Sequence, residues 1–359
     1  MTQQFDSNGV SRRDFVKGVA GIAGAFAMTG CMGTAAAVAG SGSAMSSSSL
    51  STWRDRMGLE LFTVRDVIVK DFEGTLAQVR AAGYREVETT TYANLSPREV
   101  RAILDRVGIS APSTHVALMQ GPDLEKQLAG YQEIGHRYAA ASGPRPAGMG
   151  PGGRGAGAGG PPAGGAPGGP PPGGAPGGPP PSGRGGFAMP AMTMDAVKRQ
   201  ADMLNAVGAV AKTHGIKVLI HNHTMEFEPF ADGTTPYEML FASTDPSAVV
   251  FELDIGWARV AGQDPLALFA KHPHRFPLWH VKDMAGLAAL SGIKSQGERQ
   301  RAAKIVPVGV GDINYGPIFE HAADTSLEHY FIEQDTAPDT GSLDAMRLSA
   351  TNLRRQLGG

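Results

Sequence analysis

The chain has 359 residues, and its 32 Lys and Arg against 34 Asp and Glu give a formal net charge of −2 at pH 7. A balance this close to neutral excludes the strongly basic field that nucleic-acid-binding proteins use to attract phosphates, so we expect no nucleic-acid partner. The single cysteine, Cys31, excludes an internal disulfide.

The N-terminal stretch has the features of an export signal. "SRRDFVK", residues 11–17, is followed by a mildly apolar run that ends at Cys31. This order resembles a twin-arginine signal, and the apolar run is too short and too rich in Gly and Ala for a stable membrane span. The alternative is a cytoplasmic protein with an amphipathic N-terminus. The resemblance implies export to the periplasm or cell envelope.

The stretch "MTGC" that ends at Cys31 resembles a lipobox, in which cleavage leaves a lipid-modified cysteine at the new N-terminus. We therefore predict a signal peptide over residues 1–31, lipidation at Cys31 and membrane attachment through that lipid. The alternative is a simple signal that is cleaved elsewhere. Residues 32–52 are rich in Gly, Ala and Ser and are predicted to form a flexible tether.

Eight short apolar or β-branched runs follow, most of them roughly 25 to 35 residues apart, which is the length of one strand–helix unit. They end near Leu61, Glu88, Val116, Ser142, Asn222, Asp254, Lys282 and Gln334. Eight such units predict an α/β fold of the (β/α)8 TIM-barrel type in preference to an open sheet. The fourth run contains "AAAS", which fits the continuation of a helix equally well.

Helical patterns separate these runs. Residues 72–83 are amphipathic and end on Gly83, and residues 193–215 form a long amphipathic stretch. In residues 96–108, Ser96 stands at the capping position and Pro97 at the first helical position. Such start and stop signals predict helices between the strands.

Residues 143–187 interrupt the repeat between the fourth and fifth runs. They are almost entirely Gly and Pro, and "GGAPGGPPP" occurs twice in tandem. Glycine does not recur at every third position, which excludes collagen, and the segment has too little apolar surface to fold. We predict a disordered loop insertion that divides the barrel into residues 53–142, with strands 1–4, and residues 188–359, with strands 5–8.

Barrels of this type carry their chemistry at the carboxyl ends of the strands. The polar residues that end the runs are Glu60, Glu88, His115, His221 with His223, Asp254, His280 with Lys282, and Glu333 with Asp335. The last four runs end in His, Asp, His and Glu, and all of these are competent ligands for a divalent metal. The pattern predicts a metal site, whereas a hydrogen-bonded histidine pair at a strand end is the alternative for His221 and His223.

Seven ordered motifs make the chain recognisable: "GLELFTVRD", "STHV", "IHNHTMEFE", "ELDIGWARVAGQDP", "WHVKDM", "VGVGDINYGPIF" and "YFIEQD". They resemble the xylose-isomerase-like TIM barrel family, the sugar phosphate isomerase/epimerase group that also includes inosose dehydratases and endonuclease IV. The resemblance covers residues 57 to about 336 apart from the insertion.

Members of that family bind one divalent metal through residues that end strands five to eight, typically Glu, Asp, His and Glu. The resemblance therefore implies four ligands here, which are His221, Asp254, His280 and Glu333. A mixed nitrogen and oxygen set suits Mn, Co, Zn or Fe.

The chain departs from the family at strand five, where His221 stands in place of the usual glutamate. In the sugar epimerases that glutamate and the one on strand eight form the acid–base pair, so a two-glutamate relay is in doubt here. We expect Glu333 and His223 to transfer protons.

Lys282 is predicted to act with them by steadying a substrate oxygen, and an ion pair with Asp283 or Glu252 is its alternative. We also expect three contacts to the substrate from the mouth of the barrel, which are Glu88, His115 and Trp257.

These observations predict an exported, metal-dependent sugar isomerase or epimerase that transfers a proton next to a carbonyl through a metal-stabilised enediolate. One alternative is a lyase or dehydratase that acts on keto-glycosides or keto-inositols at the same site. Another is a sugar-binding lipoprotein without catalysis. Endonuclease activity is disfavoured because the neutral charge offers no track for DNA.

Overall fold

The computed structural model describes residues 47–142, 192–336, 338 and 340–358. The predicted signal peptide, the lipidation of Cys31, most of the predicted tether and the Gly/Pro-rich insertion lie outside the described residues. That insertion falls between the fourth strand and the helix that follows it.

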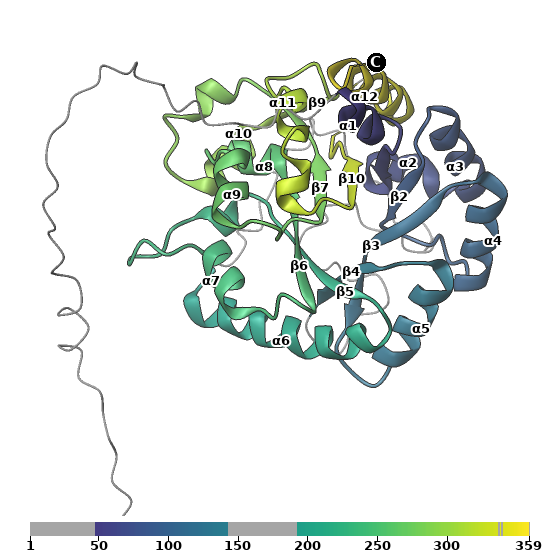
Figure 1. The fold of residues 1–359 in the computed structure, drawn as a ribbon, viewed down its shortest axis with the longest axis horizontal. Coiled ribbons are helices and arrows are strands. Elements are labelled where there is room, and N and C mark those ends of the chain that lie inside the picture. Colours follow the sequence, from purple (N-terminus) through teal and green to yellow (C-terminus); the bar gives the residue numbers. More distant parts are fainter. Residues whose placement is uncertain (1–46, 143–191, 337, 339, 359) are drawn as a thin grey trace, which may run out of the picture. The chain divides into compact units, whose positions relative to one another are not determined.

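Eight parallel strands close into a barrel, with helices around it (Figure 1). In spatial order they are β1 Gly58–Glu60, β10 His329–Ile332, β7 Leu278–Val281, β6 Val249–Asp254, β5 Lys217–His221, β4 Tyr138–Ser142, β3 Ser110–Met119 and β2 Glu86–Thr89. The barrel is closed because β1 pairs with both β10 and β2. Two further strands, β8 Asp283–Ala285 and β9 Lys304–Val306, form a separate antiparallel ribbon. The predicted (β/α)8 fold is confirmed, and the fourth run is a strand.

The helices are α1 Ser47–Arg54, α2 Arg65–Ile68, α3 Phe72–Ala81, α4 Pro97–Val107, α5 Leu124–Ile134, α6 Met194–Thr213, α7 Pro236–Ser243, α8 Ile255–Val260, α9 Pro265–Lys271, α10 Gln296–Ala302, α11 Tyr315–Phe319 and α12 Ser342–Gln356. Four 3-10 turns accompany them, η1 Leu61–Val64, η2 Met225–Phe227, η3 Leu287–Leu290 and η4 Ala322–Thr325. In the described part of the chain, no helix has both the length and the apolarity that a membrane span requires.

Helix α4 shows why local sequence places these elements well. Ser96 and Glu99 form a capping box in which each side chain bonds the other residue's backbone N–H, and Pro97 opens the helix. Gly108 closes it with a φ of 71°, a left-handed conformation that glycine adopts without strain.

The N-terminal boundary differs from the prediction. The tether was expected to extend to residue 52, but α1 begins at Ser47. Its Trp53 ring lies 6.4 Å from the rings of both Phe319 and Tyr330, and the Tyr330 hydroxyl donates a 2.7 Å hydrogen bond to the Trp53 carbonyl. The tether prediction is therefore wrong for residues 47–52, because the packing of the partly buried Trp53 outweighs a serine-rich composition.

The inside of the barrel changes character along the strands. Inside the barrel, five side chains from different strands form an apolar plug, which consists of Tyr138, Leu219, Val250, Leu278 and Phe331. Because side chains alternate along a strand, the positions two and four residues further on also face inward. On β6 these positions are Glu252 and Asp254. The plug thus forms the floor under a layer of ionisable groups.

Candidate active site

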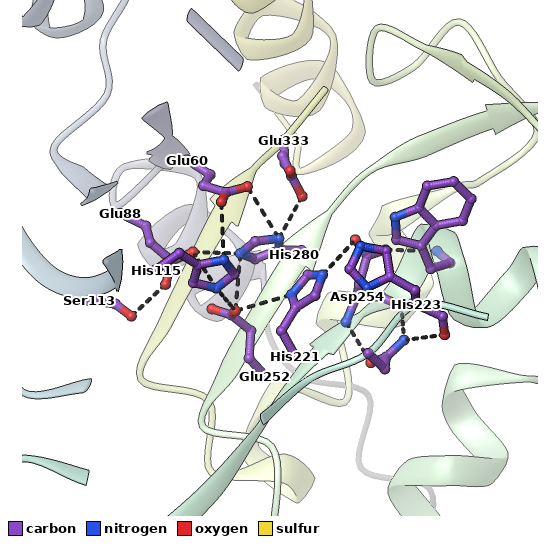
Figure 2. Close-up of polar contacts among 12 residues, drawn as sticks. Glu60, Glu88, Ser113, His115, His221, His223, Glu252, Asp254, His280 and Glu333 are labelled. Atoms are coloured by element: carbon purple, nitrogen blue, oxygen red, sulfur yellow. Dashed lines mark hydrogen bonds and ion pairs between the residues drawn. The ribbon is translucent and has the colours of Figure 1, made fainter. Parts of the chain in front are cut away.

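The carboxyl ends of the strands bring most of the predicted site residues together (Figure 2). The inward side chains there are Glu60 from β1, Glu88 from β2, His115 from β3, His221 from β5, Glu252 and Asp254 from β6, and His280 from β7. Three more follow directly after strands β7 and β10, namely Lys282, Glu333 and Asp335. The predicted site residues therefore converge, although they come from opposite ends of the chain.

The four predicted ligands form one cluster. Ligand atoms of His221, Asp254, His280 and Glu333 all lie within 4.8 Å of one another. The buried Asp254 Oδ2 accepts no hydrogen bond within the described residues, although the Lys282 ammonium stands 3.0 Å away. A buried carboxylate oxygen without a donor is costly unless a cation satisfies it. Two imidazoles and two carboxylates are a donor set that fits Mn, Fe, Co or Zn.

Asp254 is held so that this oxygen faces the cluster. Its Oδ1 accepts a 2.7 Å hydrogen bond from the Trp257 backbone N–H and so caps α8. Its backbone is tied to Asn222, whose Oδ1 accepts from the Asp254 N–H at 3.0 Å and whose Nδ2 donates to the Asp254 carbonyl at 3.2 Å. Asn222, which lies between the two histidines on the sequence, therefore fastens β5 to β6.

In both imidazole rings of the cluster, the two ring nitrogens face different partners. For His280, Nδ1 lies 2.8 Å from Glu333 Oε2 and Nε2 lies 2.6 Å from Glu88 Oε2. For His221, Nε2 lies 3.8 Å from Asp254 Oδ2 and Nδ1 lies 3.2 Å from Glu252 Oε2. Each ring thus presents one nitrogen to the four-residue cluster and the other to a glutamate below it.

Next to the cluster lies a second group of buried carboxylates that surrounds His115. The His115 Nε2 is 2.8 Å from Glu252 Oε2, and its Nδ1 is 3.3 Å from Glu60 Oε1. Burial lowers the pKa of His280, but the charges of Glu252, Glu60 and Glu88 outweigh that effect and raise it well above its ordinary value. Burial also raises the pKa of Glu60, and the charge of Glu333 adds to this. In the metal-free protein, protonated imidazole and carboxyl groups therefore offset the negative charge of these carboxylates.

Lys282 does not pair with the residues that the alternative reading of the sequence proposed. Its ammonium lies 3.0 Å from Asp254 Oδ2, 2.7 Å from Glu333 Oε2 and 2.9 Å from Asp335 Oδ1. These three carboxylates outweigh the effect of burial and raise the pKa of Lys282 well above its ordinary value. Lys282 therefore forms a buried ion pair, as the alternative held, but its partners are Asp254, Glu333 and Asp335 and not Asp283 or Glu252.

Asp283 points away from the site and holds a loop. Its carboxylate accepts backbone N–H groups of Met284, Gly309, Gly311 and Ile313 at 2.8 to 3.1 Å. Its neighbour Lys282 instead packs against α8, where a Cβ on Gly256 would stand only 2.6 Å from the Lys282 carbonyl. A glycine is therefore required beside this lysine.

His223 lies next to the cluster, and its ring contacts two other rings without forming a hydrogen bond to a described residue. Its ring centroid lies 5.0 Å from that of His221 and 5.8 Å from that of Trp257. Its backbone N–H donates to Glu226 Oε2 at 2.8 Å, and no described residue hydrogen-bonds the ring itself. Burial, reinforced by the charge of Lys282, lowers the pKa of His223 to about 4. The ring is therefore neutral near pH 7 and can accept a proton.

Two of the predicted substrate contacts differ in the structure. Glu88 is completely buried, and its carboxylate is occupied by the His280 ring and by the Ser113 hydroxyl that donates to it. Trp257 is only 4 % exposed, because the His223 ring covers it and the Lys282 ammonium stands 5.2 Å from its centroid. It supports these side chains from behind. His115 remains partly exposed, with 21 % of its side chain accessible.

Sequence reasoning considered Glu252 only as a possible partner of Lys282 and assigned no role in the site to Glu60. Glu252 stands two residues before Asp254 on β6, so the alternation of a strand places both side chains inside the barrel. That spacing could have predicted that Glu252 faces the site. Glu60 was recognised only as a strand end, and its contacts to His115 and His280 depend on the closing of the barrel.

Comparisons with known proteins agree with this fold. The model of the family described as "Xylose isomerase-like TIM barrel" matches residues 166–352. Curated relatives include inosose dehydratases from Clostridium perfringens, 31% identical over 153 residues, and from Clostridium tetani, 29% identical over 155 residues. These matches cover 39% and 41% of this chain and 48% and 51% of the relatives, so the chain spans about half the length of the curated relatives it matches.

Solved structures share the fold at low sequence identity. A sugar phosphate isomerase/epimerase from Parabacteroides distasonis superposes with a TM-score of 0.58 at 20% identity, over 83% of this chain and 96% of that one. L-ribulose 3-epimerase gives 0.52 at 14%, over 84% and 94%. A xylose isomerase-like TIM barrel protein from Mycobacterium smegmatis in complex with magnesium gives 0.52 at 14%, over 86% and 97%. Since the family model matches more than half of the chain and the closed barrel is present, the chain belongs to the xylose isomerase-like TIM barrel family.

Proposed function

We propose that this protein is a divalent-metal-dependent carbohydrate enzyme that removes a proton from the carbon next to a sugar carbonyl, as an isomerase or epimerase does. The observation that carries the proposal is the convergence of His221, Asp254, His280 and Glu333. The Asp254 oxygen in this cluster accepts no hydrogen bond from a described residue, and only the Lys282 ammonium, 3.0 Å away, balances its charge in the metal-free protein. A divalent cation held there would polarise the carbonyl and acidify the neighbouring C–H. The structure of the Mycobacterium smegmatis relative in complex with magnesium shows that a protein of this fold can bind a divalent cation, which supports the proposal.

Glu333 is the base that we assign to the first proton transfer. Burial raises the pKa of its carboxyl, but the Lys282 ammonium and the His280 ring outweigh that effect and hold the pKa well below its ordinary value. The group is therefore an ionised carboxylate near pH 7. Because a carboxylate has two oxygens, it can contact a cation with one and accept a proton with the other.

His221 cannot serve as the second proton-transferring group. Its Nδ1 faces Glu252 and its Nε2 faces the cluster, so neither nitrogen is left for a substrate. The neighbouring His223 has a neutral ring without a partner among the described residues. We therefore assign the second transfer to His223, which with Glu333 would complete a proton relay for an isomerase or epimerase.

Elimination is a second candidate, and a specific observation favours it. The curated relatives that match this chain are inosose dehydratases, and the chain has one carboxylate base where a two-base epimerase uses two. After the same proton removal, loss of a β-hydroxyl or a glycosidic oxygen would leave an unsaturated product. The substrates in this case would be keto-inositols or keto-glycosides.

We propose that the enzyme acts outside the cytoplasm, on the strength of the N-terminal resemblance to a twin-arginine signal and of the stretch ending at Cys31 that resembles a lipobox. That location favours free sugars or glycosides over sugar phosphates. A binding lipoprotein without catalysis would differ in one observable respect: the native protein would bind sugar without a metal.

Product analysis by NMR in deuterated water tests the proposal. The zinc- or manganese-loaded protein is incubated with aldoses, ketoses, keto-inositols and keto-glycosides. Deuterium at a retained carbon identifies isomerisation or epimerisation, whereas an unsaturated product identifies elimination. The Glu333→Gln variant, which keeps the shape of the side chain, is the control and should lose exchange. Absence of exchange and of elimination with every substrate and both metals would refute the proposal.

A further inference from the structure

One carboxylate oxygen lies at the meeting point of three imidazole rings (Figure 2). Glu252 Oε2 is 2.8 Å from His115 Nε2, 3.2 Å from His221 Nδ1 and 3.3 Å from His280 Nε2. Glu252 is completely buried, and its other oxygen has no hydrogen-bond partner among the described residues. The proposed proton transfers do not use this residue, so its contacts need another explanation.

The contact with His221 decides which nitrogen of that ring carries hydrogen. A neutral imidazole has one N–H and one lone pair, and a carboxylate can only accept. The nitrogen that faces Glu252, Nδ1, must therefore carry the hydrogen. The lone pair is left on Nε2, which faces Asp254 Oδ2 at 3.8 Å and so points into the four-residue cluster.

The same reasoning applies to His280, with two carboxylates in place of one. Its Nε2 lies 2.6 Å from Glu88 Oε2 and 3.3 Å from Glu252 Oε2. Nε2 therefore carries hydrogen. Nδ1 faces the Glu333 carboxylate at 2.8 Å, so it also carries hydrogen in the metal-free protein and would give that hydrogen up to bind a cation. Glu88 contacts one of the two rings in the cluster, whereas Glu252 contacts both.

We propose that Glu252 is a positioning residue that fixes the orientation of His221 and His280 and the tautomer of His221, so that Nε2 of His221 and Nδ1 of His280 face the cation site. The inference rests on the proposed metal-dependent function. Carboxylates behind histidine ligands typically contribute about 10- to 100-fold in metal affinity, because they hold the ring in place and raise its basicity.

A competing explanation is that Glu252 is itself a ligand. Ligand atoms of Glu252, His115, His221 and His280 also lie within 4.8 Å of one another. An ion there would take the ring nitrogens that face away from Asp254 and Glu333. The two explanations differ in which nitrogen of His221 carries hydrogen in the metal-free protein and in how many ions each chain holds.

The test compares Glu252→Gln with Glu226→Gln as a matched control. Glu226 undergoes the same chemical change nearby, but its carboxylate bonds the His223 backbone and touches no ring in the cluster. Zinc affinity and stoichiometry are measured by chelator competition, and folding by circular dichroism. Histidine side-chain nitrogen chemical shifts report the tautomers directly. We expect one zinc per chain, an affinity about 10- to 100-fold weaker in Glu252→Gln, and no change in Glu226→Gln.

In the metal-free native protein, we expect His221 to carry hydrogen on Nδ1, and in Glu252→Gln a mixture of both tautomers. Glu252→Asp keeps the charge with a shorter reach and should recover part of the affinity. If Glu252→Gln fails to fold, the tautomer of His221 in the native protein and the zinc affinity of Glu252→Asp still test the positioning role.

Three results would overturn the inference, and one would overturn the proposed function. Hydrogen on Nε2 of His221 in the native protein, unchanged zinc affinity in a folded Glu252→Gln, or two zinc ions per native chain would each contradict a positioning role. A native protein that binds neither zinc nor manganese would instead contradict the metal-dependent function, whatever the tautomers are.

Discussion

Replacing Lys282 by methionine removes the buried cation that lies among three carboxylates. The ammonium is 2.7 to 3.0 Å from oxygens of Asp254, Glu333 and Asp335, and only 1 % of the side chain is exposed. Methionine is similarly long and unbranched, so the K282M variant changes charge far more than packing. The metal-free variant therefore keeps the carboxylates without their compensating charge.

The expected cost follows from this burial. Removing one partner of a buried ion pair typically costs about 3 to 5 kcal/mol, because the other charge stays buried and uncompensated. A loss of about 3 kcal/mol lowers the melting temperature of a large domain by about 6 to 12 °C. Burial and the charge of Glu333 raise the pKa of Asp335 to about 7, so that group is already neutral at pH 5.5. The cost of K282M should therefore be smaller at pH 5.5 than at pH 8.

Thermal melting of chelator-treated protein at both pH values tests this reasoning. Zinc should then raise the melting temperature of K282M more than that of the native protein, because its charge replaces the one that was lost. Lys271→Met is the control. That lysine pairs with Glu238 at 2.9 Å but is 59 % exposed, so its pair contributes about 0 to 1 kcal/mol. Equal melting of K282M and the native protein at pH 8, or a larger loss at pH 5.5, would refute the argument.

Three further predictions concern single sites and the insertion. His221→Ala should strip the metal, whereas His223→Ala should keep it and lose turnover, as metal analysis and kinetics would show. The pKa of Asp335 is about 7 in the folded protein, compared with an ordinary value of 3.8. The contribution of this group to the stability of the metal-free protein therefore falls as the pH rises from about 4 through 7. Thermal melts of Asp335→Asn should lack that decline. Deleting residues 150–185 should preserve melting and metal content, because loop closure costs only about 0.6 kcal/mol per doubling of length.

Each of these predictions has a contrary outcome. Metal loss in His223→Ala with retention in His221→Ala would shift the ligand assignment on β5 by two residues. Identical pH dependence of the native and Asp335→Asn melts would place the titrating proton on another group. A collapse of stability after the deletion would indicate that the insertion packs on the barrel.

The strands could be predicted from the sequence because each is a short apolar run followed by helix signals, and the alternation of side chains then placed the polar strand ends inside the barrel. Depth along the barrel axis could not be predicted. Glu88 and His115 both end strands, yet Glu88 is completely buried and His115 is partly exposed. That difference comes from the stagger between neighbouring strands, in which Glu88 pairs with Ser113, two residues before His115.

The same stagger explains why the four-residue cluster could be predicted from the sequence, whereas the role of Glu252 behind it could not. In the register of the barrel, Glu252 is level with His221, whereas Asp254 is level with His280. Strand β6 therefore contributes carboxylates at two depths in the barrel. Glu252 lies below the cation site, and Asp254 lies in it. The imidazole of His280 spans both, since its Nε2 reaches Glu88 and its Nδ1 reaches Glu333. A ring that spans two levels connects them, so a change of charge in the lower carboxylates is transmitted to the cation site through its histidines.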